Sequence, residues 1–149
     1  MNKDGFTFNA LKINAGSKIT IVAARWNAQL VDAMVKSASN HLIKLGCKNL
    51  TTVYVPGAWE LAYGSQKALE NSDGVIAFGV VIRGETSHYE LISESAAQGL
   101  MQVSLNANKP IAFGLIAAES FEQAKQRSDP SQLDKGKEVA QSLVEMMDQ

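Results

Sequence analysis

Four short segments of this 149-residue chain combine imidazole, guanidinium, carboxylate and indole groups. They are residues 25–27 (Arg-Trp-Asn), 56–60 (Pro-Gly-Ala-Trp-Glu), 83–88 (Arg-Gly-Glu-Thr-Ser-His) and 117–127, which ends at Arg127. An indole offers a flat apolar face to a planar ligand, an imidazole transfers protons near neutral pH, and a guanidinium matches phosphate geometry. Together they indicate a site for planar, phosphorylated or polyol-bearing ligands, although these residues leave the reaction open.

The third segment has the composition of an anion site. We expect residues 84–86 (Gly-Glu-Thr) to open a helix whose free N–H groups attract a phosphate, with glycine allowing close approach to the backbone. The charge of Glu85 would repel that phosphate unless its side chain points away. His88, in the first turn, could transfer protons, and Arg127 could complete a phosphate clamp. Taken singly, each of these residues is more often structural.

Four other side chains have competing interpretations. Trp26 suits stacking on a ligand as well as a place beside a helix in the core, whereas for Trp59 the core position is favoured. His41 lies on a polar helix face, so we expect it to be solvated. Cys47 is the only cysteine and is expected to be a small buried residue rather than a reactive thiol.

Alternating apolar patterns predict the elements that must position these groups. Short β-branched or continuously apolar runs predict strands at residues 18–24, 50–55, 74–82 and 110–116. Helical spacing predicts a helix after each strand. The first is expected to have Asn27 as its N-cap and to end at Gly46. Its apolar stripe comprises Leu30, Met34, Ala38, Leu42 and Leu45. Capping boxes are expected at residues 87–90 and 120–123, and further helical stripes at 61–69, 92–103 and 140–147.

This alternation predicts right-handed crossovers and an α/β fold of three layers, in which helices flank a doubly wound, four-stranded parallel sheet. Ligands of such sheets bind beyond the carboxyl ends of the strands. Each of the four segments follows a predicted strand, so we expect them at one edge of the sheet. No linker divides the chain, and residues 1–149 are expected to form one domain.

Composition argues against several other classes. The net charge is −1, and the sequence has no basic stripe of the kind that binds nucleic acid. No apolar stretch approaches the roughly 20 residues of a membrane span, and the first residues lack the apolar core of a signal peptide, so a cytoplasmic location is expected. No His/Cys cluster has metal-ligand spacing, and phosphate-loop, nucleophile-elbow and dinucleotide-binding motifs are missing.

The same four segments resemble the lumazine synthase family. The family signature has R-[FW]-N after the first strand, V-P-G-[AS]-[FW]-E after the second, G-x-V-I-R-G-x-T-x-H after the third, and F-G followed by E-Q-A-x-x-R after the fourth. The corresponding residues of this chain are 25–27, 55–60, 79–88, 113–114 and 122–127. One motif alone carries little weight, but four in order, each at a predicted strand end, are specific.

The resemblance implies a transferase of riboflavin biosynthesis with a flavodoxin-like fold and no metal or organic cofactor. In this family the amino group of 5-amino-6-(D-ribitylamino)uracil condenses with the ketone of 3,4-dihydroxy-2-butanone 4-phosphate. A Schiff base forms, phosphate is eliminated, and ring closure with loss of water gives 6,7-dimethyl-8-ribityllumazine.

Matching motif positions also implies roles for the residues that bind the ribitylaminouracil. Trp26 would stack on the pyrimidine ring, with Asn27 next to it in the same motif. The polar edge of the uracil would meet backbone groups of Val80, Val81 and Ile82. The ribityl chain would be lined by Ala58, Trp59 and Glu60, with the Glu60 carboxylate accepting hydrogen bonds from its hydroxyls.

The second substrate would lie at the third segment. Glu85 and Thr86 would hold its phosphate, chiefly through backbone N–H groups and the Thr86 hydroxyl. Arg127 would pair with the phosphate as it leaves, and His88 would transfer protons during Schiff-base formation and elimination.

The family forms pentamers with active sites between neighbouring subunits, so we expect a homopentamer. Phe113 from the adjacent subunit would close the aromatic pocket, and Lys135 would also reach the substrate. The segment before Lys18 could add a strand to a neighbour's sheet. Stacked pentamers, an icosahedral shell and riboflavin synthase as a partner stay open.

Two departures from the family keep other functions in view. Ala117 and Ala118 replace a usual pair of threonines, and residues 128–136 replace a glycine-rich stretch, where Asp129 could compete with phosphate for Arg127. A non-catalytic member that binds flavin-like ligands, or only assembles, is therefore an alternative. An archaeal-type riboflavin synthase and a flavodoxin-like module with another ligand are further alternatives, which the four ordered motifs disfavour.

Overall fold

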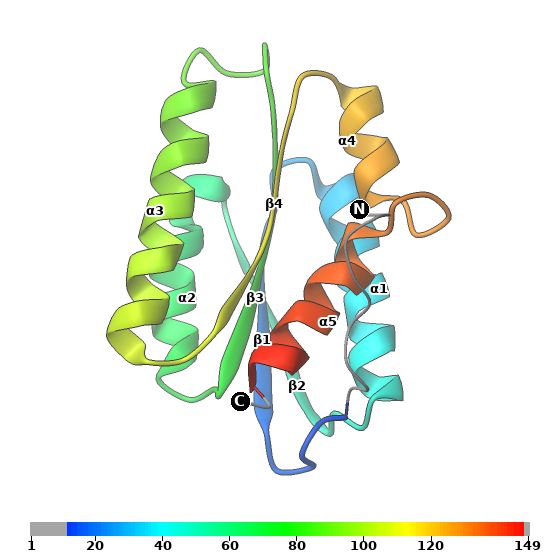
Figure 1. Ribbon diagram of the computed structural model, residues 1–149. Coiled ribbons are helices and arrows are strands. Elements are labelled where there is room, and N and C mark those ends of the chain that lie inside the picture. The colour runs from blue at the N-terminus through cyan, green and yellow to red at the C-terminus, as the bar shows by residue number, and fades with distance from the viewer. Residues whose placement is uncertain (1–11, 148–149) are drawn as a thin grey trace.

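Four parallel strands form the centre of the computed structural model, which describes residues 12–147 (Figure 1). They are ordered β2-β1-β3-β4, and their bounds are β1 (Lys18–Ala24), β2 (Asn49–Val55), β3 (Gly74–Ile82) and β4 (Ile111–Ala118). The doubly wound parallel sheet is confirmed. β4 extends beyond the predicted end at residue 116, because its pairing with β3 continues to Ile82 opposite Ala118.

Helices cover both faces of this sheet. One layer contains α1 (Ala28–Lys44), α4 (Phe121–Ser128) and α5 (Lys135–Met147). The other contains the short helix η1 (Ala58–Glu60), α2 (Leu61–Leu69) and α3 (Tyr89–Ala107), and Figure 1 shows the sheet between the two layers. Among residues 12–147, no helix is long and apolar enough to cross a membrane.

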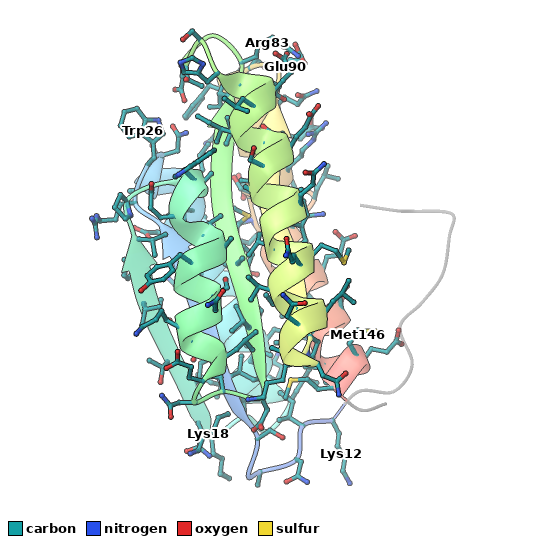
Figure 2. The ribbon with its side chains drawn as sticks, turned by 90° about the vertical axis from the view of Figure 1, so that its left-hand side faces the viewer. Lys12, Lys18, Trp26, Arg83, Glu90 and Met146 are labelled. Atoms are coloured by element: carbon teal, nitrogen blue, oxygen red, sulfur yellow. The ribbon has the colours of Figure 1, made fainter. Side chains whose placement is uncertain are left out.

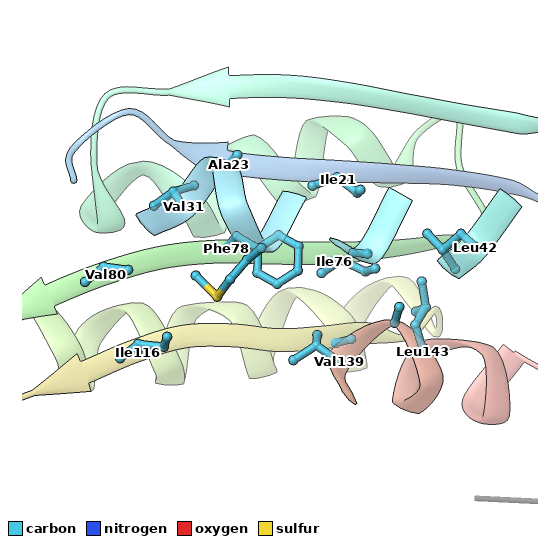
Figure 3. Close-up of a cluster of buried hydrophobic side chains, with 14 of the residues drawn as sticks. Ile21, Ala23, Val31, Leu42, Ile76, Phe78, Val80, Ile116, Val139 and Leu143 are labelled. Atoms are coloured by element: carbon cyan, nitrogen blue, oxygen red, sulfur yellow. The ribbon is translucent and has the colours of Figure 1, made fainter. Parts of the chain in front are cut away.

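The central strand β3 is buried along its whole length, which explains its continuous apolar sequence. Ile76 and Phe78 belong to the core under α1 and α5 (Figure 3), whereas Val75 and Ala77 belong to the core under α2 and α3. Opposite Phe78 in the register lies Gly114 of β4. A Cβ atom on Gly114 would lie 2.3 Å from Cδ1 of Phe78, so the Phe78 ring fits here because residue 114 has no side chain.

Two of the predicted helix caps lack the expected side-chain bonds. Asn27 is at the N-cap of α1, as predicted, but its φ of 61° is left-handed and its side chain makes no capping hydrogen bond. α3 begins at Tyr89 with no side-chain cap, so the predicted box at residues 87–90 does not form. The box at residues 120–123 is different, because the Ser120 hydroxyl accepts from the Gln123 N–H at 3.1 Å as predicted.

Cys47 was expected to be buried and His41 to be solvated, but both are at least partly buried. Cys47 is buried, as predicted, and burial raises the pKa of its thiol. The predicted solvation of His41 is wrong: its ring is partly buried, and Nε2 is enclosed without a hydrogen-bond partner among the described residues. Polar side chains of α1 and α5 surround this ring. The polar face of α1 is therefore partly covered by α5 and is not fully exposed to solvent.

Candidate active site

A cavity of about 250 Å³ lies beyond the carboxyl ends of β1, β2 and β3. Its lining consists of Trp26, Gly57, Ala58, Trp59, Val80, Val81, Ile82, Glu85, Thr86 and Ile92. Three of the four predicted segments therefore meet at one edge of the sheet, where ligands of doubly wound folds bind. Trp26 and Arg83 lie at the same end of the molecule, opposite Lys18 (Figure 2).

Both tryptophans border this cavity with much of their surface free. Trp26 is 64% exposed and Trp59 is 58% exposed, so the core position favoured for Trp59 is wrong. Most of the cavity wall is apolar, and two indoles on it offer flat faces to a planar ring. Gly57 and Ile92 also line the cavity, although neither was predicted to do so: Gly57 is part of the Val-Pro-Gly motif, and the helical spacing of Ile92 indicated a core position.

Asn27 links the loop after β1 to the loop after β3. Its Nδ2 donates to the backbone oxygen of Val80 at 3.0 Å and to Oε1 of Glu85 at 3.2 Å. The second bond draws the Glu85 carboxylate toward Asn27. The amide of Asn27 therefore already has two acceptors within the chain.

The end of β3 leaves backbone groups without a strand partner on one side. β1 pairs with β3 only as far as Phe78, while β4 continues to pair up to Ile82. Backbone groups alternate in direction along a strand, and the Val80 carbonyl points toward Asn27. Val81 therefore turns its backbone toward β4, and the N–H groups of Val80 and Ile82 face the open edge beside the cavity.

Glu60 is held by the backbone that precedes it. Its Oε1 accepts from the Gly57 N–H at 2.9 Å, which fixes the start of η1. Its second oxygen has no partner among the described residues and can accept from a ligand hydroxyl. A carboxylate in this state suits a polyol better than an anion.

Residues 83–88 form a loop rather than the first turn of a helix. Gly84 has φ +95°, a left-handed angle that favours glycine, and no protein atom lies within 4 Å of the position that a Cβ would take. The Glu85 N–H donates to Ile82 at 3.2 Å, which removes it from the phosphate donors predicted for this loop. The Thr86 hydroxyl accepts from the His88 N–H at 3.1 Å and keeps its own proton for a ligand.

Arg83 connects that loop to the start of α3 and to the residue after β4. Its guanidinium bonds to Glu90 at the start of α3 and to Glu119 after β4, the latter at 2.9 Å, and its Cζ lies 4.4 Å from the ring centre of Tyr89. The hydrogen bonds that Arg83 donates to Glu90 and Glu119 raise its pKa. This arginine fixes both ends of the segment that carries Thr86 and His88, the latter exposed just before α3.

Six predicted site residues do not line the cavity: Asn27, Glu60 and His88 are close in the chain to residues that do, and the other three are on other elements. Arg127 is on α4, in the layer opposite α3, and donates to the Ala117 carbonyl at 3.3 Å. Lys135 begins α5 and pairs with Glu138 at 3.1 Å. Phe113 is 44% exposed on the edge strand β4. A single chain therefore does not gather these three side chains around the cavity.

The predicted competition between Asp129 and phosphate is wrong. The Asp129 carboxylate accepts from the N–H and the hydroxyl of Ser131, both at 2.8 Å, and these bonds lower its pKa. It makes no ion pair with Arg127, whose side chain has no carboxylate partner within residues 12–147. The guanidinium is free to meet an anion.

Fold and site together define a doubly wound α/β protein with a largely apolar cavity at the carboxyl edge of its sheet. The described residues hold no cluster of His, Cys, Asp and Glu that could bind a metal ion. The family model for 6,7-dimethyl-8-ribityllumazine synthase matches residues 16–149, and this chain belongs to that family.

Individual relatives agree with this assignment. The 6,7-dimethyl-8-ribityllumazine synthase of Aquifex aeolicus (strain VF5) is 42% identical over 135 residues, which cover 88% of each chain. That of Campylobacter jejuni (strain RM1221) is 36% identical over 141 residues, which cover 92% of each chain. That of Nitratidesulfovibrio vulgaris (strain DP4) is 39% identical over 134 residues, covering 87% of this chain and 86% of the relative.

Proposed function

We propose that this chain condenses 5-amino-6-(D-ribitylamino)uracil with 3,4-dihydroxy-2-butanone 4-phosphate to form 6,7-dimethyl-8-ribityllumazine. The observation that carries the proposal is the convergence of Trp26, the open edge of β3 and the Thr86 hydroxyl on one cavity. These two substrates need three features: an aromatic face, a row of backbone hydrogen-bond donors, and a hydroxyl that donates a hydrogen bond to phosphate. Membership of the family supports the same reaction.

The uracil and its side chain would occupy the inner part of the cavity. The pyrimidine stacks on Trp26, and its carbonyl edge accepts from the N–H groups of Val80 and Ile82. The ribityl hydroxyls reach Ala58, Trp59 and the free oxygen of Glu60. Holding the amine in this way places it beside the loop that receives the ketone, and orientation of this kind supplies much of the rate of a two-substrate reaction.

The phosphate of the butanone would bind at residues 85–88. The Thr86 hydroxyl donates to it, while Asn27 holds the Glu85 carboxylate aside. His88 accepts the proton that the amine loses during Schiff-base formation, which releases water, and returns a proton as the hydroxyl leaves. Elimination then releases phosphate, and ring closure releases a second water.

Arg127, Phe113 and Lys135 would act on the cavity of a neighbouring subunit. Each lies away from the cavity of its own chain, and the α2–α3 layer exposes a set of large apolar side chains that would be covered in an oligomer: Trp59, Tyr63, Leu91, Met101 and Leu105. The edge strand β2 is open to a strand from another copy, for which residues before Lys18 are the proposed source; residues 1–11 lie outside the described part of the chain.

We propose that the chain forms a homopentamer. Sedimentation velocity would show whether these pentamers stack into larger particles. Arg127 would then stabilise the departing phosphate from across the subunit boundary. We further propose a cytoplasmic protein with riboflavin synthase as a partner, since that enzyme consumes the lumazine product.

The test is lumazine formation from the two substrates, followed by absorbance against a protein-free control, because the condensation proceeds slowly unaided. We expect clear acceleration by the wild-type protein and a large loss in Trp26→Ala. Ile43→Ala, which also removes a large exposed apolar side chain but lies outside the cavity and outside the α2–α3 layer, tests whether the loss is specific, with sedimentation confirming that both variants assemble. A wild-type rate equal to the control, from folded and assembled protein, would favour the non-catalytic flavin-binding alternative.

A further inference from the structure

A second hollow lies between α1 and the segment that leads into α5. Its volume is about 430 Å³, and its lining consists of Lys36, Ser37, Asn40, His41, Lys44, Pro130 and Lys137. α1 and α5 pack side by side on the face of the sheet opposite α2 and α3 (Figure 1). The hollow is within the size range of small-molecule sites, yet none of its residues takes part in the proposed reaction.

The charge of this hollow is positive, although the chain as a whole has a net charge of −1. Lys36, Lys44 and Lys137 line it, and no carboxylate does. None of the three ammonium groups forms an ion pair with a carboxylate of residues 12–147. Cations gathered in a concave surface concentrate the positive potential and raise the local concentration of anions.

Two acids close to Lys137 in the sequence are already engaged: Glu138 pairs with Lys135 at 3.1 Å, and Asp134 bonds to both helices. Its Oδ1 accepts from the Ser37 hydroxyl at 2.6 Å and from the Lys137 N–H at 3.4 Å. These bonds hold the carboxylate at the junction of α1 and α5, and they fix the first turn that carries Lys137. Asp134 offsets part of the positive charge but leaves the ammonium groups unpaired.

His41 forms part of the wall of this hollow. Its Nε2 is enclosed and has no partner among the described residues. Burial lowers the pKa of this imidazole, as do Lys137 and Lys44, while Asp134 acts in the opposite direction. The positive charge of the hollow therefore comes from the lysines, and the ring forms part of its wall.

We propose that this hollow binds the phosphate group of a small anion, held by the ammonium groups of Lys36, Lys44 and Lys137 with the side-chain amide of Asn40 as a further donor. Lysine is a common phosphate ligand because its compact charge and flexible stem adapt to tetrahedral oxygens. The occupant is inorganic phosphate or a phosphorylated small molecule, and binding is independent of the reaction at the opposite face.

Equilibrium dialysis with radiolabelled inorganic phosphate at low ionic strength tests this proposal. The Arg127→Ala variant is the parent, because it lacks the guanidinium proposed to bind phosphate in the active site. We expect the parent to retain one phosphate per chain, and added Lys44→Gln and Lys137→Gln substitutions to weaken that binding at least tenfold. Lys12→Gln and Lys48→Gln, which remove two exposed lysines elsewhere, form the matched control and should leave it unchanged.

Each outcome has a definite meaning. Equal affinity in the Lys44/Lys137 variant, or no binding by the parent at millimolar phosphate, would overturn the proposal. Ribose 5-phosphate as unlabelled competitor distinguishes the sources: stronger displacement than by phosphate itself identifies a phosphorylated organic molecule, and equal or weaker displacement identifies the inorganic ion. Lumazine formation by Lys44→Gln/Lys137→Gln with Arg127 intact should equal wild type, so failure here and failure of the proposed reaction are distinguishable.

Discussion

Asn27 and Glu85 stand on different loops, and the Nδ2 of one lies 3.2 Å from Oε1 of the other. The same Asn27 amide donates to the carbonyl of Val80 at 3.0 Å. The Asn27 side chain therefore bonds to the end of β3 and the loop after it instead of capping α1. The bond to Glu85 fixes the position of that carboxylate, next in the chain to Thr86, which we propose as a phosphate ligand.

Replacing Asn27 by glycine should weaken the binding of the phosphorylated substrate. Glycine tolerates the left-handed φ of 61° at this position, so the backbone is kept while the amide is lost. We expect KM for the butanone phosphate to rise about tenfold, as roughly 1–2 kcal/mol of carboxylate–phosphate repulsion would produce. Adding Glu85→Gln should restore KM. An unchanged KM in Asn27→Gly would show that Glu85 needs no restraint.

His88→Ala should slow lumazine formation without abolishing it. An imidazole that transfers protons contributes a factor of roughly 10²–10⁴, and substrate orientation by the other residues would persist. Steady-state kinetics should show the loss in kcat rather than in KM. Ser87→Ala, which alters an exposed neighbour in the same loop, is the control and should retain activity. Complete inactivity of folded His88→Ala protein would contradict this division of roles.

Two substitutions in the core should have opposite effects on the free energy of unfolding. Gly114→Ala would place Cβ 2.3 Å from Cδ1 of Phe78, so we expect a loss of about 1–3 kcal/mol from overpacking. Ser65→Ala removes a fully buried hydroxyl that has no hydrogen-bond partner among the described residues, and stability should stay equal or rise. Chemical denaturation of the two variants measures both. A stable Gly114→Ala protein would mean that Phe78 can move aside.

His41 should make the protein less stable in mild acid. Its pKa in the folded chain is lowered from 6.5, first by burial and then by Lys137 and Lys44. Below about pH 6.5 the unfolded chain therefore binds more protons than the folded one, and stability falls as the pH falls. Urea midpoints at about pH 7.5 and pH 5.5 should drop further for wild type than for His41→Gln. Equal drops would show that the ring is protonated as easily in the folded state.

The sequence was sufficient to predict the sheet and the edge on which the cavity lies. A continuously apolar run such as β3 can only be buried on both faces, and parallel strands bring their carboxyl ends together. Local chemistry also predicted the Ser120 cap, because the hydroxyl and its N–H partner are three residues apart.

Contacts between distant segments could not be predicted in the same way. Asn27 has the side chain of an N-cap, but Val80 and Glu85, more than fifty residues away in the chain, offer it better-placed acceptors. His41 looks solvated until α5 packs beside α1. The separation of Arg127 from Thr86 also follows only from the fold, because α4 and α3 lie in different layers. In each case a tertiary neighbour overrides a local pattern.

We propose that Arg127 of one subunit completes the cavity of the next. Mixing Arg127→Ala chains with His88→Ala chains, after dissociation and reassembly, tests it directly by lumazine formation. If the site is shared between subunits, random mixing pairs an intact His88 with an intact Arg127 at about a quarter of the interfaces, and activity should recover to about that fraction of wild type. Activity no higher than the average of the two variants assembled separately would contradict the account and place both residues in the site of one chain.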